Sequence, residues 1–168
     1  VRFEVGTTLT AVLERFAREA QERRASIWQD NASSRDALAA AHGLDDHAFI
    51  TIASIIEKEA VVDEERPMIA RVIYNRLAAG MPLQMDPTCM YSAEHHDRRP
   101  TRAVCRDPNN AYSTYVIAAL PPTPIAMPGS ASLEAALAPA DNPDVLYFVT
   151  IGDGSGRHAF ASTLDEHQ

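Results

Sequence analysis

The sequence lacks most of the features that place a chain in a specialised class. Its 168 residues include only two cysteines, seven glycines and one tryptophan, and they contain no internal repeat and no low-complexity segment. No apolar run approaches the roughly 20 residues of a membrane-spanning helix. There is no phosphate-binding loop, no dinucleotide-binding fingerprint and no zinc motif of usual spacing. We therefore expect neither a cofactor nor a bound metal.

Positive charge is also scarce. The chain carries 15 lysines and arginines against 23 aspartates and glutamates, which gives a net charge of −8. Nonspecific binding to nucleic acid or to an anionic membrane surface is therefore not favoured. Four arginines do cluster in one predicted loop, and we expect them to lie on a solvated surface: Arg98, Arg99, Arg102 and Arg106.

The two ends lack the marks of a complete secreted protein. Val1 is not an initiator Met, no signal peptide follows it, and Gln168 falls within a pattern rather than after one. We expect the chain to be cut from a longer protein, so its targeting is not readable from these residues. With 46% hydrophobic residues, its length still suffices for one domain with its own core.

The two cysteines, Cys89 and Cys105, leave two interpretations open. An even count fits a disulfide in an oxidising compartment, and two buried free thiols fit as well. His95 and His96 lie between them in the sequence, which makes a zinc site conceivable. The spacing matches no usual zinc pattern, so we do not favour a metal.

Hydrophobic periodicity predicts helices in the first half of the chain. Before residue 45 it predicts a strand over 1–5 and then a long helix over 7–28 with Leu9, Leu13 and Phe16 on one face. A polar loop over 30–36 and a short helix over 37–42 follow. Three further helices are predicted with their start and stop residues: one after Asp45 or Asp46 over 47–61, one from Pro67 to Gly80, and a short one capped by Asp86.

Loops and strands dominate the predictions for the second half. Residues 93–111 lack apolar periodicity and are predicted to form a surface loop. The proline-rich residues 120–129 are predicted to form an extended segment. The other predictions are a strand over 112–117, a helix over 133–137, a buried strand over 145–151, a hairpin partner over 157–161 and a truncated last helix. The expected fold class is α+β: a helical first part packed on a small, mainly antiparallel sheet formed largely by the later half.

The stretch ASIIEKEA, residues 53–60, places two glutamates at the end of one predicted helix. At about 100° per residue, Glu59 projects beside the apolar stripe that contains Ile52 and Ile56. Glu57 points away from Glu59, toward the solvent side with Lys58. Only one acid of the pair is therefore expected near the core.

Two roles are open for Glu59. Aliphatic neighbours raise the pKa of a carboxyl because burial disfavours its charged form, and a protonated carboxyl near neutral pH can act as a general acid. The alternative is a structural ion pair with Arg71 or Arg76, because perturbed carboxyls are often structural.

Several blocks of the sequence resemble one enzyme family. They are IASIIEKEA, ERPMIARVIYNRLAAGMPLQMDPT, AYSTY, LPPTPIAMPG, and LYFVTIGDG followed by HAF, in consistent order over residues 45–168. They resemble the YceG/MltG family of endolytic murein transglycosylases, which cut the glycan strands of peptidoglycan. The resemblance implies a catalytic domain over 45–168 after a partial linking segment over 1–44. It also implies that the family's membrane anchor and most of its LysM-like module lie outside this chain.

The same resemblance implies site residues. The family's catalytic acid, the second glutamate of its EKE block, falls on Glu59. The implied substrate-binding residues are Gln84, Asp86, Thr88, Tyr112, Ser113, Thr114, Tyr115 and His158. This chain departs from the family pattern twice, because Ser113 replaces an asparagine and Arg157 replaces the second glycine of a G-G-H-x-F turn. Structural alternatives exist for several positions; for His158 we favour a hydrogen-bonded residue near the cleft over a catalytic base.

The implied reaction is nonhydrolytic cleavage of the β-1,4 bond between N-acetylmuramic acid and N-acetylglucosamine, which leaves 1,6-anhydro ends. Two alternatives stay open: a noncatalytic peptidoglycan-binding module, and a hydrolase of the same bond in which Asp86 or Glu57 activates water. The implied partners are peptidoglycan glycan strands, with cell-wall synthases as further candidates. The implied location is the bacterial cell envelope, on the periplasmic or outer face of the inner membrane, held by an anchor outside this chain.

Overall fold

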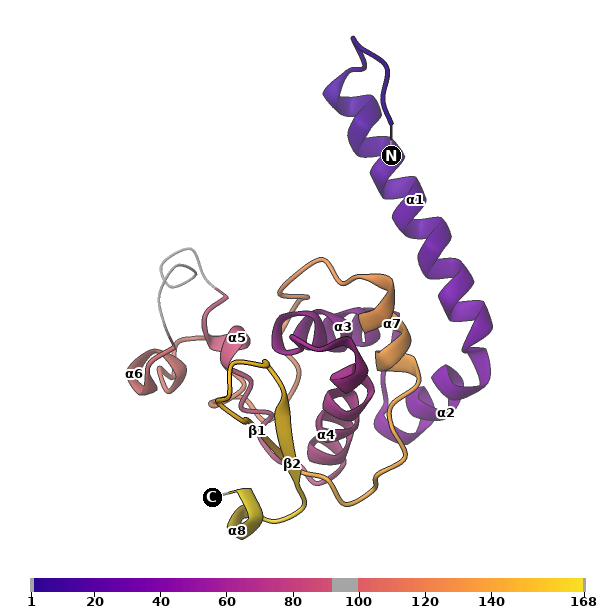
Figure 1. The fold of residues 1–168 in the computed structure, drawn as a ribbon. Coiled ribbons are helices and arrows are strands. Elements are labelled where there is room, and N and C mark those ends of the chain that lie inside the picture. The colour runs from indigo at the N-terminus through magenta and orange to yellow at the C-terminus, as the bar shows by residue number, and fades with distance from the viewer. Residues whose placement is uncertain (1, 92–99, 168) are drawn as a thin grey trace.

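The computed structural model describes residues 2–91 and 100–167, and most of its regular structure is helical (Figure 1). The helices are α1 (Leu9–Asp30), α2 (Ala32–His42), α3 (Asp46–Glu59), the 3-10 turn η1 (Asp63–Glu65), α4 (Arg66–Ala78), α5 (Asp86–Cys89), α6 (Arg102–Cys105), α7 (Ser130–Leu137) and α8 (Leu164–His167). The strands are β1 (Tyr147–Thr150) and β2 (His158–Ala161), which pair antiparallel with Phe148 opposite Phe160. The chain is thus mostly helical with a small antiparallel sheet late in the sequence, which confirms the predicted class in its coarse form.

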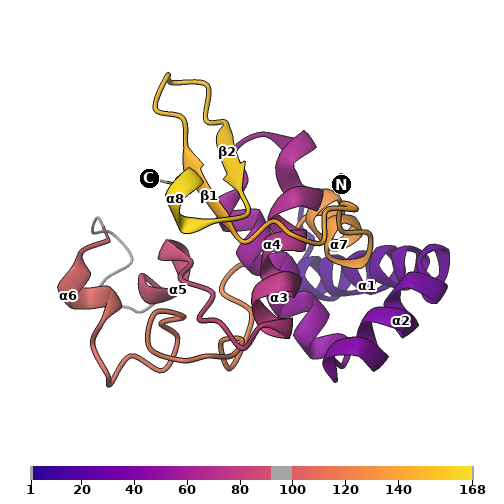
Figure 2. The ribbon, with the colours of Figure 1, turned by 90° about the horizontal axis from the view of Figure 1, so that it is seen from below.

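The core forms where α3, α4 and α7 pack together, with α3 in contact with both other helices (Figures 1 and 2). From α3 it takes Phe49, Ile52 and Ile56, all buried. The predicted apolar face of α3 is buried at Ile52 and Ile56, and the helix is covered on further sides, because the polar Thr51 and Ser54 are buried as well. The Ser54 hydroxyl is satisfied within the helix, since it donates to the Thr51 carbonyl at 2.7 Å.

The predicted helix ends are confirmed by their capping groups. The Thr8 hydroxyl accepts from the backbone N–H of Ala11 at 3.3 Å, and the Asp45 carboxylate accepts from that of Ala48 at 2.8 Å. A proline lies in the first turn of α4, and Gly80 follows that helix with a left-handed φ of 63°.

Two predictions for the N-terminal part are wrong. Residues 2–5 form no strand, because the backbone N–H of Thr7 bonds back to the Glu4 carbonyl at 3.1 Å and bends the chain. The polar residues 30–36 are mostly helical instead of a loop. The Asn31 side chain donates to the Ile27 carbonyl at 2.9 Å, so one residue suffices to separate α1 from α2.

Two predictions for the later half are also wrong. Residues 112–117 follow successive turns instead of a strand, with the N–H of Ser113 bonded to the Asn110 carbonyl at 3.0 Å. The strand predicted over 145–151 is confirmed only over 147–150. It is not buried on both faces: Val149 is 44% exposed, because the two-stranded sheet has one uncovered face. The predicted hairpin partner is confirmed in β2.

Helix α1 extends away from the core (Figure 1). Its predicted buried face is exposed at Leu9, Leu13 and Phe16, and only Ile27 and Trp28 at its other end are buried. The helix is therefore amphipathic as predicted, but only its last turns bury apolar side chains in the core. None of the helices in residues 2–91 and 100–167 is long and apolar enough to cross a membrane.

Candidate active site

Glu59 is the last residue of α3, and its side chain is partly buried. The helix ends there because Ala60 adopts an extended conformation, with φ −75° and ψ 120°. The pKa of Glu59 rises from 4.5 to about 8, chiefly because burial disfavours the charged form and also because the Asp86 carboxylate lies close by. A hydrogen bond from the backbone N–H of Asp86 partly opposes the rise. At pH 7 the side chain is therefore mainly protonated.

Asp86 joins this acid to a tyrosine. The Tyr115 hydroxyl donates to Asp86 Oδ1 at 2.5 Å. The pKa of Tyr115 is raised, first by burial and then by this hydrogen bond, with the charges of Asp86 and Glu59 acting in the same direction. The prediction that Asp86 caps its helix is wrong, because Asp86 is the first residue of α5 and makes no side-chain capping bond. Its carboxylate instead accepts from Tyr115, while its backbone N–H bonds to Glu59.

The ion pair considered for Glu59 is not formed with either arginine. Arg71 donates to the Ala140 carbonyl at 2.5 Å, and the buried Arg76 donates to the Leu83 carbonyl at 2.6 Å. Among the residues that the structure describes, no cation lies at ion-pairing distance from Glu59. The two arginines brace the backbone around the site and leave the acid neutral.

Glu57 has the opposite environment. Its Oε2 accepts from the Ser132 hydroxyl at 2.6 Å and from the backbone N–H of Gly129 at 3.0 Å, and it lies 3.5 Å from the Arg66 guanidinium. The hydrogen bond from Ser132 is the main reason that the pKa of Glu57 is lowered. The predicted position toward solvent is confirmed in part, since the Glu57 side chain is 31% exposed. The prediction did not foresee that α7 packs on this side of α3 and presents its N-terminal end to the carboxylate. Glu57 is thus an ionised structural acid.

Thr88 and Thr114 lie in the interior beneath the site, where both are fully buried. Their hydroxyls are 2.8 Å apart, and each also serves the backbone: Thr88 donates to the Met85 carbonyl at 2.6 Å, and Thr114 accepts from the Met85 N–H at 2.9 Å. The two side chains therefore have no surface to offer to a substrate in this conformation. They fix the segment before α5 against residues 112–115.

Gln84 is held in a strained conformation beside these residues. Its φ of 53° is the only positive φ of a residue other than glycine in the described part of the chain. The side chain is exposed, and the backbone N–H donates to the Thr114 carbonyl at 3.0 Å. Non-glycine residues in this region cluster at functional sites, where the surrounding structure holds them.

The segment 112–115 presents one aromatic side chain and buries the next residue. Tyr112 packs edge-on against Tyr91 with ring centroids 4.9 Å apart, and its hydroxyl lies 2.9 Å from the Thr123 hydroxyl. Ser113, which departs from the expected asparagine, is fully buried and donates to the Cys105 carbonyl at 2.5 Å. This serine therefore attaches the segment to α6.

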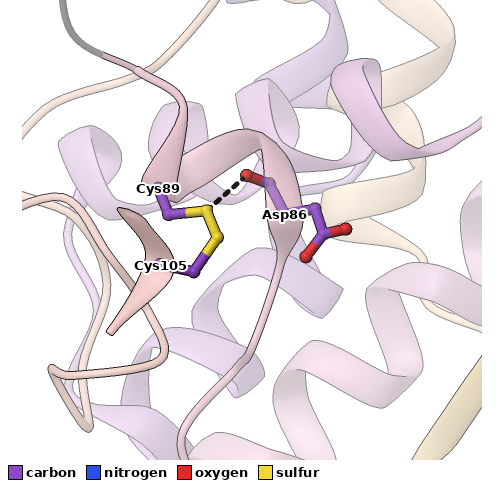
Figure 3. Close-up of side chains that lie close together, drawn as sticks. All are labelled: Asp86, Cys89 and Cys105. Carbon is purple, nitrogen blue, oxygen red and sulfur yellow. Dashed lines mark hydrogen bonds between the residues drawn. A yellow bond between two sulfur atoms is a disulfide. The ribbon is translucent and has the colours of Figure 1, made fainter. Parts of the chain in front are cut away.

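Cys89 and Cys105 form a disulfide, which settles the choice between a disulfide and free thiols (Figure 3). The Asp86 carboxylate is directed away from the two sulfurs, while its backbone carbonyl faces them (Figure 3). The ligand atoms of these three residues lie within 4.8 Å of one another, but sulfurs joined in a disulfide supply no thiolate to a metal. His95 and His96, with Arg98 and Arg99, lie outside the described residues.

His158 pairs with Glu65, a residue that the sequence did not single out. Its Nδ1 lies 2.8 Å from Glu65 Oε2, and its backbone N–H donates to the same carboxylate at 3.2 Å. Both side chains are largely buried, and Arg157 lies 3.8 Å from the other oxygen. No periodicity links residue 65 to residue 158, so only the spatial structure reveals this pair. The expectation of a hydrogen-bonded histidine is confirmed.

A pocket of about 230 Å³ adjoins Asp86 and Tyr115. Its other wall is residues 100–106, which include α6 with Arg102 and Arg106. Asp86 thus borders the pocket and also lies beside the neutral acid Glu59, while Glu59 itself is not among the lining residues. Such a pair of acids in different states can supply a proton to a bound group while stabilising positive charge beside it.

Sequence comparison places the chain in a family. The profile of the YceG-like family matches residues 2–168, and the chain belongs to that family. An endolytic murein transglycosylase of Bacillus subtilis is 45% identical over 122 residues, which cover 72% of this chain and 32% of that protein. An endolytic murein transglycosylase of Streptococcus pneumoniae is 28% identical over 165 residues, or 96% of this chain and 28% of that protein.

A solved structure agrees with the fold. The crystal structure of a putative YceG-like protein from Listeria monocytogenes superposes with a TM-score of 0.70 at 41% identity, covering 82% of this chain and 44% of that one. The chain spans about a third of the length of the B. subtilis relative. The match therefore concerns one part of a longer architecture.

Proposed function

We propose that this chain is the catalytic part of an endolytic murein transglycosylase, with residues 45–168 as the catalytic domain and 1–44 as a linking segment. The observation that carries the proposal is Glu59, a carboxyl with a pKa of about 8 at a helix end beside Asp86. The matching relatives that bear this enzyme name support it. Cleavage of a glycosidic bond requires an acid that donates a proton to the leaving oxygen, and a carboxyl that is protonated at neutral pH can do so.

The proposed reaction uses Glu59 twice. The side chain first gives its proton to the oxygen that leaves the muramyl C1 as an oxocarbenium-like state develops. The resulting carboxylate then takes a proton from the C6 hydroxyl of the same sugar, and that oxygen closes on C1 to form the 1,6-anhydro ring. No water is consumed, and the internal attack has the high effective concentration of an intramolecular reaction.

Other residues have supporting roles in this proposal. Asp86 keeps Glu59 protonated before the reaction and places negative charge near the developing oxocarbenium. Tyr115 holds the Asp86 carboxylate, and the exposed Gln84 and partly exposed Tyr112 are the candidate sugar contacts.

The buried polar residues act as positioning residues and not as contacts. Thr88, Ser113 and Thr114 are fully buried and hydrogen-bonded within the protein. His158, tied to Glu65, holds β2 near the end of η1, and we assign it a structural role.

The direct test compares Glu59→Gln with the matched variant Glu57→Gln on purified glycan strands. We expect Glu59→Gln to lose at least about a hundredfold in rate, because a positioned proton donor contributes about 10²–10⁴-fold. Glu57→Gln should still form anhydro ends. Mass spectrometry of the products identifies the chemistry. Near-normal anhydro product from Glu59→Gln would refute the mechanism.

The two alternative functions give different products in the same experiment. A hydrolase of the same bond would leave reducing muramyl ends in place of anhydro ends. A noncatalytic module would bind strands without any new ends. The wild-type protein therefore distinguishes the three functions before any variant is compared.

The proposed function implies a place and a set of partners. Peptidoglycan lies in the bacterial cell envelope, and the disulfide of this chain agrees with an oxidising compartment there. We propose peptidoglycan strands as the substrate, cell-wall synthases as candidate partners, and membrane attachment only through a segment outside this chain. Nucleic acid is not expected as a partner of a chain with net charge −8.

A further inference from the structure

Two arginines, one at each end of α6, line the pocket beside the candidate active site. Arg102 is the first residue of α6 and Arg106 is the residue that follows it, and both line the cavity of about 230 Å³ together with Asp86 and Tyr115. Both arginines are exposed. The sequence suggested only a solvated loop at this position, whereas the fold brings these charges to the edge of the site.

Over residues 2–91 and 100–167, no carboxylate lies at ion-pairing distance from Arg102 or Arg106. Among the lining residues that the structure describes, Asp86 is the one acid, and its Oδ1 already accepts from the Tyr115 hydroxyl. The described lining of this pocket thus carries two arginines and one acid, next to the proposed catalytic acid of a chain whose net charge is −8.

The two arginines also stand on a fixed support. The disulfide from Cys105 ties α6 to α5, and the Ser113 hydroxyl donates to the Cys105 carbonyl at 2.5 Å. The Thr101 hydroxyl accepts from the N–H of Val104 at 3.3 Å and begins the helix. A backbone held this way loses little entropy when its side chains bind a ligand, so the pocket is preorganised.

We propose that this pocket is a subsite for a carboxylate carried by the substrate, read by Arg102 and Arg106. The inference rests on the proposed function and adds to it. Guanidinium groups bind carboxylates in a planar, bidentate manner. Asp86 borders both Glu59 and the pocket, so a glycan bound at Glu59 extends its anionic substituents toward α6. In a murein strand such carboxylates belong to the stem peptide or, where the peptide is missing, to the lactyl group of muramic acid.

Binding to an uncleaved strand tests the subsite. Glu59→Gln serves as the parent, so that ligand stays intact, and calorimetry compares it with the same protein carrying Arg102→Gln and Arg106→Gln. The ligands are peptide-bearing strands, strands stripped of peptides, and chitin oligosaccharides, which carry no carboxylate. We expect the double substitution to raise the Kd for carboxylate-bearing strands by about tenfold or more, since hydrogen bonds to charged groups are lost. The Kd for chitin oligosaccharides should stay within about twofold.

Two controls separate charge recognition from structure. Arg18→Gln with Arg23→Gln removes two positive charges from α1, which lies on the other side of the molecule from α6 (Figures 1 and 2), and should change no Kd. Arg102→Lys with Arg106→Lys keeps the charge and should restore part of the affinity. Both variants of the pair Arg102 and Arg106 should keep the parent's unfolding temperature. In the described part of the chain the hydrogen bond between these two arginines joins their backbones, from the Arg106 N–H to the Arg102 carbonyl at 3.1 Å, and the substitutions leave it in place.

Each outcome decides between named possibilities. Weakened binding to peptide-bearing strands alone supports the subsite with a stem-peptide carboxylate as its ligand, and weakened binding to stripped strands alone supports it with the lactyl carboxylate. Weakened binding to both strand types supports a subsite that accepts either carboxylate. Equal Kd values for parent and double variant on every ligand would overturn the subsite and leave the proposed function standing. A parent that binds none of the strands, together with a wild-type protein that produces no anhydro ends, would overturn both.

Discussion

Replacing Glu59 by glutamine should make folding stability depend less on pH, and the direction follows from the site. In the unfolded chain Glu59 ionises near 4.5, whereas in the folded protein it ionises near 8. Between these values the folded state holds a proton that the unfolded state releases. The free energy of unfolding of the wild type therefore falls as pH rises through this window. In Glu59→Gln this contribution to the pH dependence is absent, because glutamine does not ionise.

The size of the effect follows from the same pKa values. Each pH unit inside the window is worth about 1.4 kcal/mol of differential stability. From about pH 4.5 to about pH 7 the wild type should lose up to about 3 kcal/mol relative to Glu59→Gln. An effect of this size is a large share of the stability of a small domain.

Urea unfolding of both proteins at several pH values measures this difference. Subtracting one stability curve from the other removes the contributions of all other titrating groups. Glu57→Gln is the matched control, because Glu57 lies two residues away and its pKa is shifted in the opposite direction. Because the pKa of Glu57 is lowered, its stabilisation is present above its unfolded pKa and is lost as pH falls through the folded pKa.

The result that would refute the reasoning is a stability difference between wild type and Glu59→Gln that is the same at every pH. Such a result would mean that Glu59 ionises in the folded protein as it does in the unfolded chain. The proposed proton donor would then be a carboxylate at neutral pH.

Two further predictions concern the support of the site. Replacing both Cys89 and Cys105 by serine should lower the free energy of unfolding by about 3 kcal/mol, since the bond closes a loop with a sequence separation of 16; unchanged urea unfolding would contradict this. Gln84→Gly should raise stability by roughly 0.5 to 1 kcal/mol, because relief of the left-handed φ of 53° exceeds the entropy cost of glycine. A thermal shift downward would contradict that prediction.

Local signals predicted a large part of the helical structure. Thr8 and Asp45 begin helices because their side chains bond to the next turn, and Gly80 ends one because it can adopt a left-handed φ. Glu59 was chosen by helical geometry and by the family resemblance, and its raised pKa agrees with that choice. The helix starts and ends depend on residues a few positions apart, whereas the raised pKa of Glu59 also depends on burial in the fold and on the distant Asp86.

Contacts between distant residues were not predictable in this way. Glu57 bonds to Ser132, 75 positions away, and Glu65 bonds to His158, 93 positions away. Neither pair leaves a periodic trace in the sequence. Residues 112–117 are strand-like in sequence, but none of the strands in the described part of the chain pairs with them, and turns satisfy their backbone instead.

The two threonine hydroxyls below Gln84 have a consequence for local motion. The backbone N–H groups of Met85 and Thr114 both donate to buried hydroxyl oxygens. Their amide protons can therefore exchange with solvent deuterium only when this hydrogen-bond network opens locally. The irregular segment before α5 and residues 112–115 are therefore joined by buried hydrogen bonds, as neighbouring strands of a sheet are. The wall of the candidate site should behave as a slow-exchanging unit in spite of its loop-like appearance.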